Sequence, residues 1–117
     1  MKIKGYTLHG DYYLADEVIT YTNWEEACEM IEEIILPNCK KITAHTLSKE
    51  ELESIPEKER ECGRWYWTNT SVGSCGAWNV LYHGSFLTKV IGNFNSTGGA
   101  RLGFHKNEIK KQLLNIE

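Results

Sequence analysis

Apolar residues recur at helical spacing between residues 24 and 35, and this pattern predicts a long first helix. Thr22 and Glu25 are spaced as a capping box at its start, and Pro37 ends it. The residues on its apolar face are Trp24, Ala27, Cys28, Ile31, Ile34 and Ile35. We expect that face, Cys28 included, to lie in the core.

The remaining pattern predicts mostly strands and one short second helix. Ser48 and Glu51 form a second capping box, and this helix ends near Pro56. A charged surface loop is expected at 57–61. Strands are expected within 2–14 with a turn at Gly10, and then at 41–47, 64–68, 77–83, 86–91 and 101–105. Residues 107–116 fit either a helix or a returning strand. The prediction is one α+β domain over residues 1–117, with two helices packed on a twisted antiparallel sheet.

The order of these elements and four local strings resemble the C-type-lectin-like fold. The similarity is to its bacterial and phage branch, which includes formylglycine-generating-enzyme-like domains and variable proteins of diversity-generating elements. Residues 23–28 (NWEEAC) resemble the branch's W-x-x-A helix start, and 42–52 (ITAHTLSKEEL) its R-L-P-T-x-x-E-L segment without the proline. Residues 64–70 (RWYWTNT) resemble Y-W-T-S-T. Residues 77–80, 84–86 and 99–104 resemble A-W-x-V, G-S and R-x-G-F.

The resemblance implies that long loops in the C-terminal half form a binding face on a rigid sheet. It does not carry over calcium-dependent sugar binding, because Val80 follows Trp78-Asn79 where the lectins have an acid. It does not carry over the oxidase chemistry either, since no cysteine follows Cys75. We therefore expect no metal, no cofactor and no catalytic residue.

Polar and aromatic residues of the expected loops are the first candidates for contact with a partner. The residues proposed for that contact are Asn69, Tyr82, His83, Asn93, Asn95 and Arg101. Rigid aromatic rings beside adaptable amides and hydroxyls are typical of protein-recognition surfaces. Arg101 has a structural alternative, because its planar fork of donors is suited to anchoring a loop.

A second candidate surface is the acidic side of the first predicted helix, where Glu29, Glu32 and Glu33 would form a stripe. Such a stripe can occupy a basic site meant for nucleic acid. A solvated helix face is the alternative explanation. Residues 1–62 carry 7 basic and 14 acidic residues, and the whole chain has a net charge of −3, so direct nucleic-acid binding is not expected.

These features predict a non-enzymatic domain that binds a protein, consistent with a phage or mobile-element product such as an inhibitor of a host defence protein. A phage receptor-binding, display or carbohydrate-binding module is the first alternative. The second is an enzyme in which His83 activates Cys62 or Cys75. We expect a cytoplasmic protein because no signal peptide or membrane segment is evident, and Cys62 with Cys75 is the disulfide to test if it is exported.

Overall fold

The computed structural model describes residues 2–74, 76–90 and 99–114, and within these ranges the chain forms strands and short helices. The strands are β1 (Tyr6–His9), β2 (Tyr12–Ala15), β3 (Ile19–Thr20), β4 (Ile31–Ile35), β5 (Lys41–Thr46), β6 (Tyr66–Val72), β7 (Gly76–Val80), β8 (Phe86–Val90), β9 (Gly99–Ala100) and β10 (Leu102–His105). The α-helices are α1 (Trp24–Glu29), α2 (Lys49–Glu53) and α3 (Asn107–Leu114), and a 3-10 helix spans Glu57–Arg60. The α+β class is therefore confirmed.

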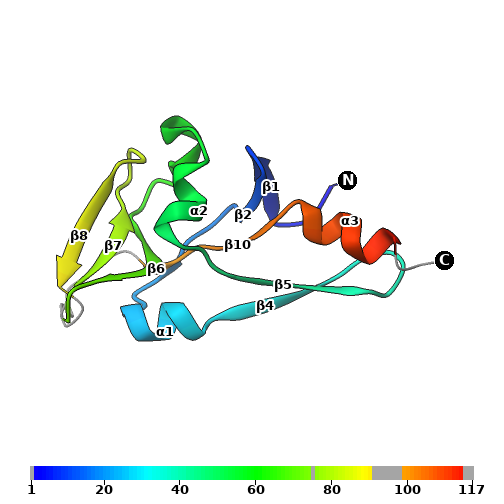
Figure 1. The fold of residues 1–117 in the computed structure, drawn as a ribbon, viewed down its shortest axis with the longest axis horizontal. Helices are drawn as coiled ribbons and strands as arrows, with labels where there is room; N and C mark the ends of the chain where they lie inside the picture. The colour runs from blue at the N-terminus through cyan, green and yellow to red at the C-terminus, as the bar shows by residue number, and fades with distance from the viewer. Residues whose placement is uncertain (1, 75, 91–98, 115–117) are drawn as a thin grey trace.

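The described strands form two five-stranded sheets where the sequence predicted one. The first has the order β1-β2-β10-β5-β4 and the second has the order β3-β9-β6-β7-β8. Figure 1 shows β6, β7 and β8 at one end of the molecule, and the β4–β5 hairpin reaching toward the other. The chain passes from one sheet to the other at Arg101, the single residue between β9 and β10.

Close backbone packing at Gly99 joins three strands of the second sheet. Gly99 in β9 lies antiparallel to β3 and parallel to β6. A Cβ atom at this position would stand 1.7 Å from the carbonyl oxygen of Ile19. Glycine is therefore the residue that allows β3, β9 and β6 to pack this closely.

The predicted first helix is wrong beyond Glu29. The chain becomes extended at Met30 (ψ 133°), and β4 then pairs with β5 from Ile31 opposite His45 to Ile35 opposite Lys41. β-branched isoleucines favour strands, and this preference together with cross-strand pairing prevails over the helical spacing. The predicted core position of Cys28 is also wrong, because its side chain is exposed.

The cap of α1 lies one residue later than predicted. Asn23 Oδ1 accepts the backbone N–H of Glu26 at 2.8 Å, which satisfies a donor left free in the first helical turn. The Thr22 hydroxyl instead donates to the Ile19 carbonyl oxygen at 3.0 Å. Thr22 therefore ties the start of the helix back to β3.

Locally encoded elements agree with the sequence prediction. The Ser48–Glu51 capping box is present at α2, and the β7–β8 hairpin turns through residues 81–85. Residues 107–114 are helical, which settles the open alternative for that segment. The predicted loop at 57–61 is mostly a 3-10 helix, and Arg60 at its end is buried.

Three apolar clusters hold these elements together. The first lies on one face of the first sheet and includes Tyr13 and Phe104, whose rings stack at 5.1 Å, with Ile109 of α3. The second joins the sheets through α2 and contains Leu14, Leu47, Leu52, Ile55, Tyr66 and Val80. The third packs α1 on the second sheet through Ala27, Trp67, Ala77 and Ala100. Trp67, which is 1% exposed, is the largest buried side chain of this third cluster.

Asn79 in β7 departs from the usual pairing of buried polar groups. Its side chain is fully buried, and among the described residues neither its amide nitrogen nor its amide oxygen has a hydrogen-bond partner. An unsatisfied buried amide costs about 1–3 kcal/mol of stability. The amide therefore weakens the fold it occupies.

Replacing this amide by an apolar, β-branched side chain should stabilise the protein. We expect Asn79→Val to raise the free energy of unfolding by about 1 kcal/mol, because the desolvation penalty disappears and strand preference improves. Urea denaturation of both proteins measures the change. Asn79→Asp is the control and should lose stability because it buries a charge. A less stable Asn79→Val protein would show that the amide contributes favourably.

Candidate functional site

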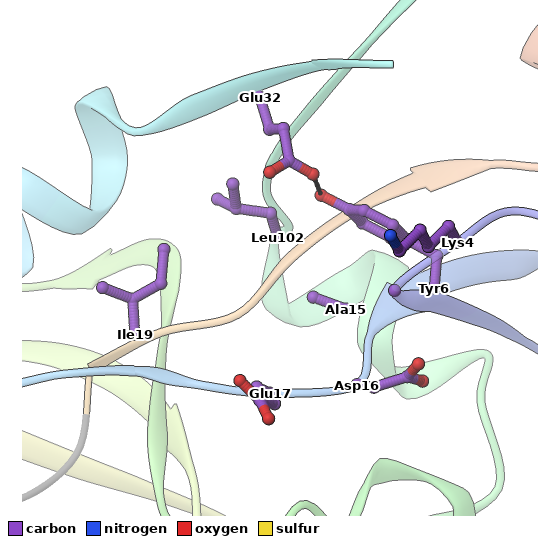
Figure 2. Close-up of a pocket in the computed structure, with 9 residues that line it drawn as sticks. Lys4, Tyr6, Ala15, Asp16, Glu17, Ile19, Glu32 and Leu102 are labelled. Atoms are coloured by element: carbon purple, nitrogen blue, oxygen red, sulfur yellow. Dashed lines mark hydrogen bonds between the residues drawn. The ribbon is translucent and has the colours of Figure 1, made fainter. Parts of the chain in front are cut away.

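An open cleft of about 470 Å³ lies over one face of the first sheet, beside its junction with β3. Figure 2 shows Glu32 on one side, Asp16 and Glu17 on the other, and Ala15 and Leu102 between them. The side chains and backbone that line it belong to Lys4, Gly5, Tyr6, Ala15, Asp16, Glu17, Ile19, Glu32 and Leu102. The cleft therefore combines an apolar floor with a charged rim.

A hydrogen bond from Tyr6 to Glu32 builds one wall of the cleft. The Tyr6 hydroxyl donates to Glu32 Oε1 at 2.7 Å, across 26 positions of the chain. Burial raises the pKa of Tyr6 well above its usual value, and the hydrogen bond and negative charge of Glu32 raise it further. Tyr6 therefore stays a neutral donor at physiological pH. It orients one oxygen of the Glu32 carboxylate.

Asp16 and Glu17 form the opposite rim, in the segment that joins β2 to β3. The Asp16 backbone N–H donates to the Gly5 carbonyl oxygen at 2.9 Å, and its carboxylate accepts the Thr7 hydroxyl at 2.6 Å. These bonds fix the rim against β1. Ile19, 47% exposed, adds apolar surface next to it.

The charges and the floor define what the cleft can bind. Three carboxylates line it against one amine, that of Lys4. A Lys or Arg side chain has an aliphatic stem and a cationic head, so it matches both the apolar floor and the acidic rim. The cleft is therefore suited to holding a cationic side chain by contact and charge.

The predicted acidic stripe is not a single surface. Glu29 ends α1, whereas Glu32 and Glu33 are neighbours in β4 and point to opposite faces of the sheet. Glu32 enters the cleft, and Glu33 lies 3.4 Å from Lys41 on the other face. The helical arrangement proposed for these three residues is therefore wrong.

The predicted loop residues have separate environments. Tyr82 and His83 are exposed at the β7–β8 turn, with ring centroids 4.9 Å apart, and His83 Nε2 lies 2.6 Å from the Ser85 hydroxyl. Asn69 is exposed, but its amide donates to the Thr46 carbonyl oxygen at 3.0 Å. Asn93 and Asn95 lie outside the described residues.

Arg101 is a buried anchor and does not belong to an exposed binding face. Only 4% of the residue is accessible. Its Nε donates to the Ala15 carbonyl oxygen at 2.7 Å, and Nη1 donates to the Arg60 carbonyl oxygen at 3.1 Å and to the Tyr66 hydroxyl at 3.2 Å. These contacts support the alternative role for Arg101, in which its planar fork of donors anchors the backbone.

The proposed Cys/His pair is not assembled around Cys62. The Cys62 thiol is free and half-buried, and it lies 3.4 Å from the Asp16 carbonyl oxygen. Burial raises its pKa more than nearby Arg101 lowers it, whereas a nucleophilic thiol needs a lowered pKa. His83 is hydrogen-bonded to Ser85 instead. Cys75 lies outside the described residues.

A second cavity, of about 420 Å³, was missed by sequence reasoning. Its lining includes His45, His105, Glu51 and Glu108, which come from β5, β10, α2 and α3. His105 Nδ1 accepts the Asn107 backbone N–H at 3.0 Å, and this bond orients the ring. The Tyr12 ring packs edge-on against His105 at 4.8 Å. Only the β5–β10 register, which pairs Gly103 with His45, reveals that these histidines share a face.

Metal ligation and membrane crossing are considered for residues 2–74, 76–90 and 99–114. Three or more His, Cys, Asp or Glu side chains are nowhere grouped there as a metal ion would require. No helix in that part of the chain has the length and apolar character needed to cross a membrane.

The chain matches no protein-family model, no curated protein and no solved structure.

Proposed function

We propose that this protein is a non-enzymatic binding domain that recognises a protein partner, and that a Lys or Arg side chain of that partner occupies the cleft between Glu32 and Glu17. The observation that carries the proposal is the combination of three carboxylates with the apolar floor of Ala15 and Leu102. The Tyr6 bond orients Glu32 before binding, so less conformational entropy is lost on association.

The C-type-lectin-like fold is a further part of this proposal. Its support is that the first hairpin pairs with the last strand, since β2 lies beside β10, while β6, β7 and β8 form a separate antiparallel set. In this fold the loops of the C-terminal half would offer a second contact surface. The exposed Tyr82 side chain, 66% accessible, favours the β7–β8 turn as part of it.

The inhibitor hypothesis fits the same cleft. An enzyme that handles nucleic acid presents Lys and Arg side chains for phosphate binding. A protein that captures one of them in an acidic cleft would occlude that surface, and its association would be faster at low salt.

Removing charge from the cleft tests the proposal. The protein is immobilised, host proteins are captured and identified by mass spectrometry, and the purified partner is then titrated. We expect the double change Glu17→Gln, Glu32→Gln to weaken binding by about tenfold, because it removes two partly screened ion pairs worth about 0.5–1 kcal/mol each. Glutamine at 32 keeps an oxygen that can accept the Tyr6 hydroxyl.

The matched control is the double change Glu25→Gln, Glu50→Gln, which alters net charge equally at exposed positions of α1 and α2. Its affinity should stay within twofold of the original. If both double variants lose the same affinity for the partner, the effect comes from the overall charge of the protein, and a role for the cleft is contradicted.

A further inference from the structure

The outer edge of β4 is an unoccupied strand-pairing surface. β4 ends the first sheet, so β5 pairs with one side of it and no described strand pairs with the other. Figure 1 shows β4 along the boundary of the molecule. Exposed strand edges are natural sites for a further strand.

The hydrogen-bonding pattern identifies which backbone groups face outward. The Leu36 N–H donates to the Lys40 carbonyl oxygen at 2.8 Å, so Leu36 and Lys40 form a hydrogen-bonded pair of the β4–β5 hairpin. Such pairs alternate along an antiparallel ladder. The backbone N–H and C=O groups of Ile34 and Glu32 therefore point toward β5. The N–H and C=O groups of Ile31, Glu33 and Ile35 point away from the sheet.

The same three residues present an amphipathic surface beside that edge. Ile31 is 63% exposed and Ile35 is 68% exposed. Glu33 stands between them along β4, and its carboxylate lies 3.4 Å from Lys41 Nζ. These side chains share one face because alternate residues of a strand do so. An added strand would cover the two isoleucines.

Charge selects the occupant of this edge. A second copy pairing antiparallel about the centre of β4 would set Glu33 opposite Glu33. The exposed ion pair with Lys41 at 3.4 Å compensates this charge only in part, and like charges directly opposite each other destabilise a sheet. A partner strand with basic residues opposite Glu32 and Glu33, and apolar residues opposite Ile31 and Ile35, is complementary.

We propose that the β4 edge binds an extended segment of the protein partner as a sixth strand of the first sheet, with the pattern apolar-apolar-basic-basic-apolar. This inference rests on the proposed function, because the basic residue opposite Glu32 lies on the face that carries the cleft. One segment thereby supplies both the strand and the cation.

A synthetic peptide, acetyl-Thr-Val-Ile-Lys-Arg-Val-Thr-amide, is the probe. Paired antiparallel, it sets lysine opposite Glu33 and arginine opposite Glu32. We expect binding by fluorescence anisotropy, and slower hydrogen exchange at the amides of Ile31, Glu33 and Ile35. N-methylation of its two valines and its lysine should weaken binding at least tenfold, because these N–H groups would face β4. N-methylation of its isoleucine and arginine should change binding less than threefold.

Several outcomes overturn the inference. One is no binding of the peptide, and another is equal weakening by both methylation patterns. A third is a wild-type dimer in sedimentation that dissociates on the changes Ile31→Ser and Ile35→Ser, because a second copy would then occupy the edge. A failure of the proposed function can be told apart from a failure of this inference. If the Glu17→Gln, Glu32→Gln protein still binds the peptide and its affinity for the partner is unchanged, only the role of the cleft is contradicted.

Discussion

Arg101→Met is expected to lower the free energy of unfolding by about 3–4 kcal/mol. The buried guanidinium donates to the carbonyl oxygens of Ala15 and Arg60 and to the Tyr66 hydroxyl. Hydrogen bonds from a charged donor contribute about 1.5–3 kcal/mol each, and their loss leaves buried acceptors without a partner. These bonds also join β2, the 3-10 helix and β6 at the point where the chain changes sheets.

Urea denaturation with Arg101→Lys as the comparison measures this effect. Lysine keeps the charge but has no planar fork with which to reach three acceptors. Arg101→Lys should therefore lower the free energy of unfolding by less than Arg101→Met does, but by a measurable amount. A loss below about 1 kcal/mol for Arg101→Met would contradict the anchoring role.

Gly84→Ala is expected to lower the free energy of unfolding by about 3 kcal/mol. Gly84 has φ +95°, where a non-glycine residue is strained by about 1–2 kcal/mol. The new Cβ atom would also stand 2.0 Å from the Glu57 carbonyl oxygen. The β7–β8 turn must then move, which disturbs the bond of 2.8 Å from Arg60 Nε to the Gly84 carbonyl oxygen.

Gly73→Ala separates these two causes. Gly73 has φ +63°, but a Cβ atom there would meet no atom within 4 Å. Gly73→Ala should therefore lower the free energy of unfolding only by the backbone strain of alanine at positive φ, about 1–2 kcal/mol. Similar losses for both alanine variants would show that the contact with Glu57 does not constrain the turn.

Elements encoded by neighbouring residues could be predicted from the sequence. The Ser48–Glu51 box and the turn at Gly10 depend on residues within a few positions, and both are present. The prediction of a long first helix is wrong because the same apolar spacing also fits a short helix followed by a strand. The competing signal, the isoleucines from Ile31 onward, was present but favours a strand only when β5 is there to pair with it.

The cleft could not be predicted because its parts are distant in the chain. Tyr6, Glu32 and Leu102 meet through the pairing of strands from three regions, and no local pattern records that pairing. The charge of Glu32 marks it as a candidate in the sequence, but its neighbour Glu33 faces the other side of the sheet. Arg101 was considered as an anchor from its donor geometry, although nothing in the sequence identified its acceptors.

The structure of the complex with the captured partner shows whether a cationic side chain occupies the cleft. We expect a Lys or Arg side chain of the partner with its nitrogen within ion-pair distance of the Glu32 carboxylate and its stem against Leu102. A complex in which the partner contacts the Tyr82–His83 turn and leaves the cleft open to solvent would contradict it.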